Sequence, residues 1–167
     1  YIQKANVSLF THIAVTLLLL LLVLGAGYMA ITSMAARTYV LEINQRLYRD
    51  VAEHLVSETQ PLKNGRLDTT ATHDIMHSMM VINPSVEVYL LDTTGKIIDY
   101  VVPFSSVALD EVDLTPIKTF LQESDKTLVL GDDPKEVGAT NIFSAAPIIE
   151  DSVLQGYAYI ILAGALQ

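Results

Sequence analysis

The sequence predicts an α+β fold: an N-terminal transmembrane helix that continues into a long helix, then a five-stranded, mostly antiparallel sheet with flanking helices. Three observations indicate it. An uncharged apolar stretch opens the chain, helical spacing of apolar residues continues after it, and later runs rich in β-branched and aromatic residues are divided by turns. A length of 167 residues leaves room for one ordinary domain and an attachment.

The first predicted element is a transmembrane helix over residues 9–32. No charged residue occurs between Lys4 and Arg37, and about 20 apolar residues cross the roughly 30 Å apolar core of a bilayer. A cleaved signal peptide is the alternative, with the small residues at 25–27 near its end. Secretory apolar regions are usually shorter, about 7–15 residues, which favours the anchor. A buried helix of a soluble protein is the third interpretation.

The second predicted element is a long helix over residues 33–59 that continues the first. No glycine or proline interrupts residues 28–60, and Pro61 with the turn at 63–66 ends the helix. Apolar residues recur on one face at spacings of three and four, and we predict that this face forms a parallel homodimer. The sheet domain can cover its upper turns, which leaves the lower turns to a second copy. The face consists of Val40, Ile43, Leu47, Val51 and Leu55.

The remaining residues, 60–164, are predicted to form one domain with a modest core. It begins with a helix over 69–82, which the proline at 84 ends. A short helix over 114–122 divides the strands into two groups. The strands are expected at 86–91, 97–102, 127–130, 141–149 and 156–162. Short turns between successive strands favour antiparallel pairing, with the helices packed on the sheet.

The charge distribution predicts where each part lies. Lys4 and Arg37 are the only charged residues among the first 37, so 8 of the 10 basic residues and all 19 acidic residues follow, a net charge of −11. An acidic domain argues against nucleic acid as a partner and is compatible with export. We expect residues 1–8 on the cytoplasmic side of the membrane and residues 38–167 on the opposite side.

Two segments carry a resemblance to a known family. The run Asn83 to Asp92, followed by Gly95, Lys96 and Ile97, resembles the start of the sheet in extracytoplasmic PAS-like (PDC, or Cache) sensor domains. The run from 143 to 148, followed by 156 to 160, is similar to the closing hairpin of such domains. Bacterial membrane sensor histidine kinases place this domain between two membrane spans, ahead of a helical linker and the kinase core. The resemblance therefore implies the bacterial inner membrane, with residues 38–167 in the periplasm and 165–167 starting a link to a second span.

The resemblance implies a function for the parent protein and not for these residues alone. We expect the sensory input segment of a two-component sensor histidine kinase, in which a stimulus shifts the helices that cross the membrane. ATP and Mg²⁺ would bind the kinase core, which would also engage a response regulator, and the segment itself would need no cofactor. The same module in a chemoreceptor or a cyclic-dinucleotide signalling protein is the alternative, as is an anchored periplasmic binding or assembly protein.

Aromatic and polar residues in the predicted strands are candidates for a small-molecule site. Aromatic bodies with polar tips suit a pocket formed by a sheet and its covering loops, and they equally suit an ordinary core. Because side chains alternate along a strand, the candidates cannot all face one side. They are Tyr89, Asp99, Tyr100, Phe143, Tyr157 and Tyr159.

Metal binding and catalysis are less favoured by the sequence. His73, Met76, His77 and Met80 would share one helix face, and imidazole and thioether groups bind soft metals, but core packing is the more common role of such methionines. We therefore expect no metal site. The chain has no G-x-S-x-G, H-E-x-x-H or Walker motif, so it offers no recognisable catalytic residues.

Overall fold

A computed structural model gives the fold. It describes residues 9–59, 62–63, 66–67, 73, 77–78, 81, 86–102, 107–122 and 128–162. By its contacts the chain divides into two compact units, Tyr1–Tyr39 and Val40–Gln167. Helix is the only secondary structure among the described residues of the first unit, and the second contains the sheet. The predicted α+β class, with a long apolar N-terminal helix ahead of a five-stranded antiparallel sheet, is confirmed.

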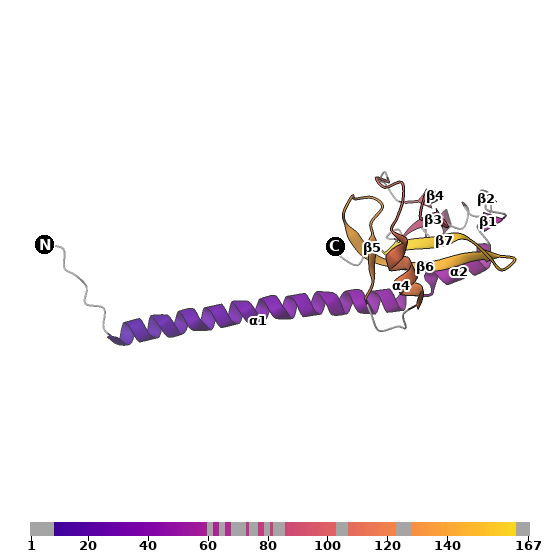
Figure 1. Ribbon diagram of the computed structural model, residues 1–167. Coiled ribbons are helices and arrows are strands. Elements are labelled where there is room, and N and C mark those ends of the chain that lie inside the picture. The colour runs from indigo at the N-terminus through magenta and orange to yellow at the C-terminus, as the bar shows by residue number, and fades with distance from the viewer. Residues whose placement is uncertain are drawn as a thin grey trace. The chain divides into compact units, whose positions relative to one another are not determined.

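Helix α1, Leu9–Leu47, contains the predicted membrane segment (Figure 1). Its 39 residues at 1.5 Å rise give a length of roughly 58 Å, about twice the apolar core of a bilayer. All residues from Leu9 to Val40 are exposed to solvent in the isolated chain. Within the described residues, this N-terminal part supplies the one helix that is long and apolar enough to cross a membrane.

The helix predicted to run unbroken to Thr59 is interrupted. Helix α1 ends at Leu47, a turn occupies 48–50, and α2 spans Val51–Thr59. In this turn the Arg49 N–H donates to the Arg46 carbonyl, 3.3 Å away, and the Val51 N–H to the Tyr48 carbonyl at 3.1 Å, so the spacing tightens from four residues to three. The prediction of one continuous helix was therefore wrong at residues 48–50, and we call this turn the helix joint.

The sheet has five strands in the order β4-β3-β7-β6-β5, and every neighbouring pair is antiparallel. A separate pair, β1 with β2, places Lys63 opposite Arg66, which are the first and last residues of the turn predicted at 63–66. The strands are β1 Leu62–Lys63, β2 Arg66–Leu67, β3 Val86–Asp92, β4 Ile97–Val101, β5 Leu130–Asp132, β6 Thr140–Glu150 and β7 Val153–Leu162. Helix α4, Leu114–Gln122, has the bounds that the sequence predicted.

Both faces of the central strands are covered, which explains why β3 is buried along its length. Alternation sends Val88 and Leu90 to one face, where Ala52 and Leu55 of α2 pack. It sends Tyr89 and Leu91 to the other face, where α4 packs. The two cores therefore lie on opposite sides of one sheet, with α2 and α4 as their covers (Figure 1).

The five residues of the predicted dimer face fall into two groups, one before and one after the helix joint. Leu55 is buried and Val51 packs against the sheet core, so the chain covers these two itself. Val40, Ile43 and Leu47 remain exposed, at 49%, 43% and 72% of their surface. The apolar face open to a second copy is therefore limited to these three residues of α1.

Two further expectations meet the structure only in part. The third strand was expected at 127–130 and is found at Leu130–Asp132, three residues later at its start. The helix expected at 69–82 lies mostly outside the described residues. Its described members, which are His73, His77, Ser78 and Val81, are helical and exposed.

Candidate functional site

The structure brings four of the six predicted ligand residues together. Tyr89, Phe143, Tyr157 and Tyr159 are buried on the sheet face that α4 covers. The ring centroids of Phe143 and Tyr159 lie 5.0 Å apart, and those of Tyr89 and Tyr159 lie 6.4 Å apart. These are distances at which aromatic rings attract one another in tilted arrangements. The four residues form one aromatic cluster.

The other two candidates lie apart from this cluster or at its edge. Tyr100 is 45% exposed on edge strand β4, with its ring centroid 6.4 Å from that of Tyr89. Asp99 is paired with Leu90, whose side chain belongs to the opposite core, and its carboxylate accepts the Tyr100 N–H at 2.8 Å. The structure thus separates Asp99 from the aromatic cluster. A ligand role for the other five stays a prediction.

A buried charge beside the aromatic cluster was missed by the sequence analysis. Glu87 is fully buried on β3, two residues before Tyr89 and on the same face. One carboxylate oxygen forms an ion pair with Lys135, and the other accepts the Tyr89 hydroxyl at 2.9 Å. Burial, followed by the neighbouring Glu87 charge, raises the pKa of the Tyr89 hydroxyl, so that hydroxyl stays protonated and donates. The sequence did contain a signal for it, because Glu87 is an acidic residue within a mainly apolar strand.

Lys135 belongs to the loop between β5 and β6, which several hydrogen bonds attach to its surroundings. The Tyr159 hydroxyl donates to the Asp132 carbonyl at 2.8 Å. The Pro134 carbonyl accepts the N–H groups of residues 108 and 109 at 2.8 and 3.0 Å. Burial, with the charges of Asp132 and Asp133, raises the pKa of the Tyr159 hydroxyl. The loop thus sits against the edge of the aromatic cluster with the Lys135 ammonium directed to Glu87.

A second feature is the helix joint, where Ser144 of β6 holds the turned backbone. The Ser144 hydroxyl donates to the Arg49 carbonyl at 2.6 Å and accepts the Ala52 N–H at 3.2 Å. Ser144 is fully buried. One side chain therefore satisfies a carbonyl and an N–H that a continuous helix would have paired internally, and this stabilises the break.

Arg49 and Gln45 connect the same region to two other elements. The Arg49 guanidinium lies 4.4 Å from the Phe120 ring centroid and donates to the Phe120 carbonyl at 2.7 Å, at the end of α4. Gln45, buried in α1, donates to the carbonyls of Val129 and Phe143 at 2.7 and 3.1 Å and accepts the Val129 N–H at 2.9 Å. The helix joint is thus hydrogen-bonded to β6 and α4, and the end of α1 just before it is hydrogen-bonded to β6 and to the segment before β5.

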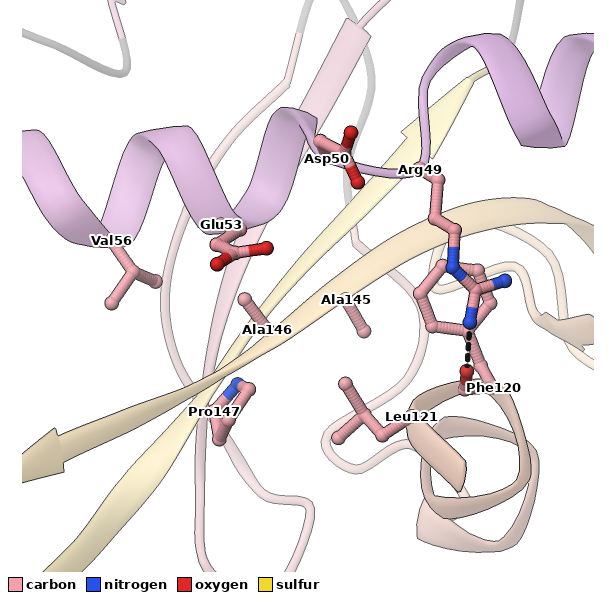
Figure 2. Close-up of a pocket in the computed structure, with 9 residues that line it drawn as sticks. All are labelled: Arg49, Asp50, Glu53, Val56, Phe120, Leu121, Ala145, Ala146 and Pro147. Carbon is pink, nitrogen blue, oxygen red and sulfur yellow. Dashed lines mark hydrogen bonds between the residues drawn. The ribbon is translucent and has the colours of Figure 1, made fainter. Parts of the chain in front are cut away.

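A cavity of about 350 Å³ opens beside the helix joint, between α2, α4 and β6. Figure 2 shows Arg49 against the Phe120 ring on one side, with Ala145, Ala146 and Pro147 as the floor. The nine lining residues are Arg49, Asp50, Glu53, Val56, Phe120, Leu121, Ala145, Ala146 and Pro147. They combine three charged side chains with mainly apolar ones, a lining that suits non-covalent binding of a small molecule.

The candidate metal face is only partly visible. His73 and His77 are exposed, whereas Met76 and Met80 lie outside the described residues. Within the described part of the chain, no three histidine, cysteine or acidic side chains are close enough to hold a metal ion.

Comparison with known proteins identifies no relative. No family model, no curated protein and no solved structure matches the chain. The resemblance to PAS-like sensor domains therefore stays a prediction, and functional inference depends on the contacts of the helix joint and the aromatic cluster.

Proposed function

We propose that this chain is the sensory input segment of a membrane receptor, a two-component sensor histidine kinase. The observation that supports this most is the continuity of α1. One helix contains the apolar stretch and, near its end, the buried Gln45 that hydrogen-bonds to the sheet domain. A change in the domain can thus act on a helix that is long enough to cross the bilayer.

In this proposal the helix joint is where a stimulus reaches α1. A ligand or physical stimulus that shifts α4 or β6 must move Phe120 or Ser144, and both bond directly to Arg49. Packed elements rearrange in small discrete steps, because a close-packed interior does not deform smoothly. A small displacement of α1 is the expected output, passed to a kinase core that binds ATP and Mg²⁺ and phosphorylates a response regulator.

The proposed receptor is a parallel homodimer. Val40, Ile43 and Leu47 form an exposed apolar strip on α1, and this strip lies on the helix side opposite Gln45, which faces the sheet. Packing two such strips together removes apolar surface from water, at about 25 cal/mol per Å². The partner is therefore a second copy of α1, aligned by the membrane that both helices enter.

The proposed location is the bacterial inner membrane, with the sheet domain in the periplasm. Alkaline phosphatase fused after Thr59 should be active, and β-galactosidase fused at the same position should be inactive. The full chain should stay in the membrane pellet after carbonate extraction. Release into the soluble periplasm would instead identify the N-terminal helix as a signal peptide and overturn the anchored receptor.

The coding sequence after Gln167 separates a receptor from the other candidates. A second apolar span, a helical linker and a kinase core should follow. A methyl-accepting helical domain or a cyclic-dinucleotide domain in that place would keep the sensor and change its output. A stop codon would leave an anchored periplasmic binding or assembly protein and would refute the receptor.

A further inference from the structure

Glu87 is a fully buried acid in a strand whose other members are mainly apolar. A carboxylate in such a place is costly unless it is paired and hydrogen-bonded. Both of its oxygens are engaged, one by Lys135 and one by the Tyr89 hydroxyl. No other described donor reaches the oxygen that meets Lys135. The cation from Lys135 is therefore what keeps this carboxylate compatible with the core.

We propose that Glu87 and Tyr89 form a binding site for a primary ammonium group, which the chain fills with its own Lys135. The Tyr89 hydroxyl holds one carboxylate oxygen at 2.9 Å and leaves the other for the cation. The Tyr159 and Tyr100 rings neighbour Tyr89, each with its centroid 6.4 Å from that of Tyr89. The site shares no residue with the cavity at the helix joint.

The geometry selects an ammonium over other cations. A guanidinium pairs best with two parallel carboxylate oxygens, and here Tyr89 already occupies one of them. Calcium prefers six to eight oxygen ligands, and one free carboxylate oxygen falls far short of that. A compact ammonium with three donors needs a single strong acceptor, which Glu87 provides.

The site is reachable, because the side chain of Lys135 is 24% exposed although that of Glu87 is almost completely buried. Lys135 enters from the β5–β6 loop, a segment outside the regular sheet. A free alkylammonium can thus follow the path that the lysine stem now takes. Its binding would displace the Lys135 ammonium from Glu87.

The test replaces Lys135 with alanine in the full chain, held in detergent micelles, and supplies the deleted atoms as n-propylammonium. Near-UV circular dichroism of the tyrosines reports melting, since the chain has eight tyrosines and no tryptophan. Lys135→Ala should lower Tm by on the order of 10 °C, because it leaves a buried carboxylate unpaired. For a dissociation constant of about 10 mM, roughly 100 mM n-propylammonium should restore on the order of 5 °C.

The controls make the rescue specific. Lys118→Ala, at an exposed lysine on α4, should melt like the wild type and gain nothing from n-propylammonium. Neutral 1-propanol should not rescue Lys135→Ala, and n-propylammonium should not rescue the double variant with Glu87→Gln. If Lys135→Ala does not fold alone, recovery of folded protein on refolding with n-propylammonium replaces the melting curve. Absence of rescue, or equal rescue by 1-propanol or in the double variant, overturns the proposal.

Discussion

Replacing Gln45 with glutamate tests the attachment of α1 to the sheet domain. The Gln45 amide is buried, with 4% of the residue exposed, and its nitrogen donates to two carbonyls while its oxygen accepts one N–H. Glutamate keeps the shape and the accepting oxygen but replaces the donor with an oxygen that faces both carbonyls. One buried carbonyl and one partly buried carbonyl lose a partner at about 1–3 kcal/mol each, so we expect a loss of roughly 3–5 kcal/mol in unfolding free energy at neutral pH.

The loss should depend on pH in a defined direction. Burial and the two carbonyls raise the pKa of the new glutamate above its unfolded value of about 4.3. Below the unfolded pKa, the glutamate is protonated in both the folded and the unfolded state. The loss of stability is then smallest, since a protonated carboxyl can still donate one hydrogen bond. As pH rises through the folded pKa, the folded state must ionise and the penalty reaches its maximum. Gln45→Glu should therefore approach the wild type in acid and fall furthest below it at neutral pH.

The unfolding free energies of the variant and the wild type are compared by urea unfolding of the full chain in micelles, in acid and at neutral pH. Tyrosine circular dichroism follows the unfolding. Asn44→Asp makes the same amide-to-acid change at the preceding position of the helix and should cost less than about 1 kcal/mol. A loss for Gln45→Glu no larger than that of Asn44→Asp would refute this account of the attachment. So would a loss that does not change with pH.

Three further predictions address other contacts. Gly131→Ala should cost about 1–3 kcal/mol in urea unfolding, because its Cβ would lie within 2.9 Å of Phe143 and closer still to the Tyr159 hydroxyl; unchanged stability would contradict the packing of β5. The Thr115 N–H, 2.8 Å from the Asp113 carboxylate, lowers the pKa of Asp113. Asp113→Ala should therefore cost about 1 kcal/mol at neutral pH, and the difference should shrink as pH falls below about 3.9, through the lowered folded pKa; a constant difference would exclude that cap. Cysteine at Ile43 should cross-link two membrane-bound copies far more readily than cysteine at position 42, and equal yields would exclude a dimer through the apolar strip.

Much of the fold could be predicted because it follows from local patterns. Alternation and turn residues placed β3, β4 and β6 close to their observed bounds, and the segment Leu114–Gln122 was predicted to the residue. Strand β7 was predicted at 156–162 and begins earlier, at Val153. Strand β5 was displaced because Gly131 and Asp132 have low strand propensity. Gly131 is required there by the close approach of Tyr159, a contact between residues distant in sequence.

The helix joint could not be predicted for a similar reason. Residues 48–50 contain no glycine or proline, and the break depends on Ser144 and Phe120, which lie far along the chain. The aromatic cluster was predicted in part, because alternation shows which residues of one strand share a face. It does not show which loop covers that face, so the pairing of Glu87 with Lys135 was missed.

The central claim is that the helix joint transmits a signal from the sheet domain to a membrane-crossing helix, and phosphorylation measures it most directly. Membranes carrying the full-length gene product should incorporate label from radiolabelled ATP. Ser144→Ala, which removes the side chain that holds the Arg49 carbonyl and the Ala52 N–H, should change that rate by about 2- to 30-fold. Glu58→Gln, at an exposed position on the same α2 helix, should leave it unchanged. Absence of labelling, or equal rates in the two variants, would contradict the claim.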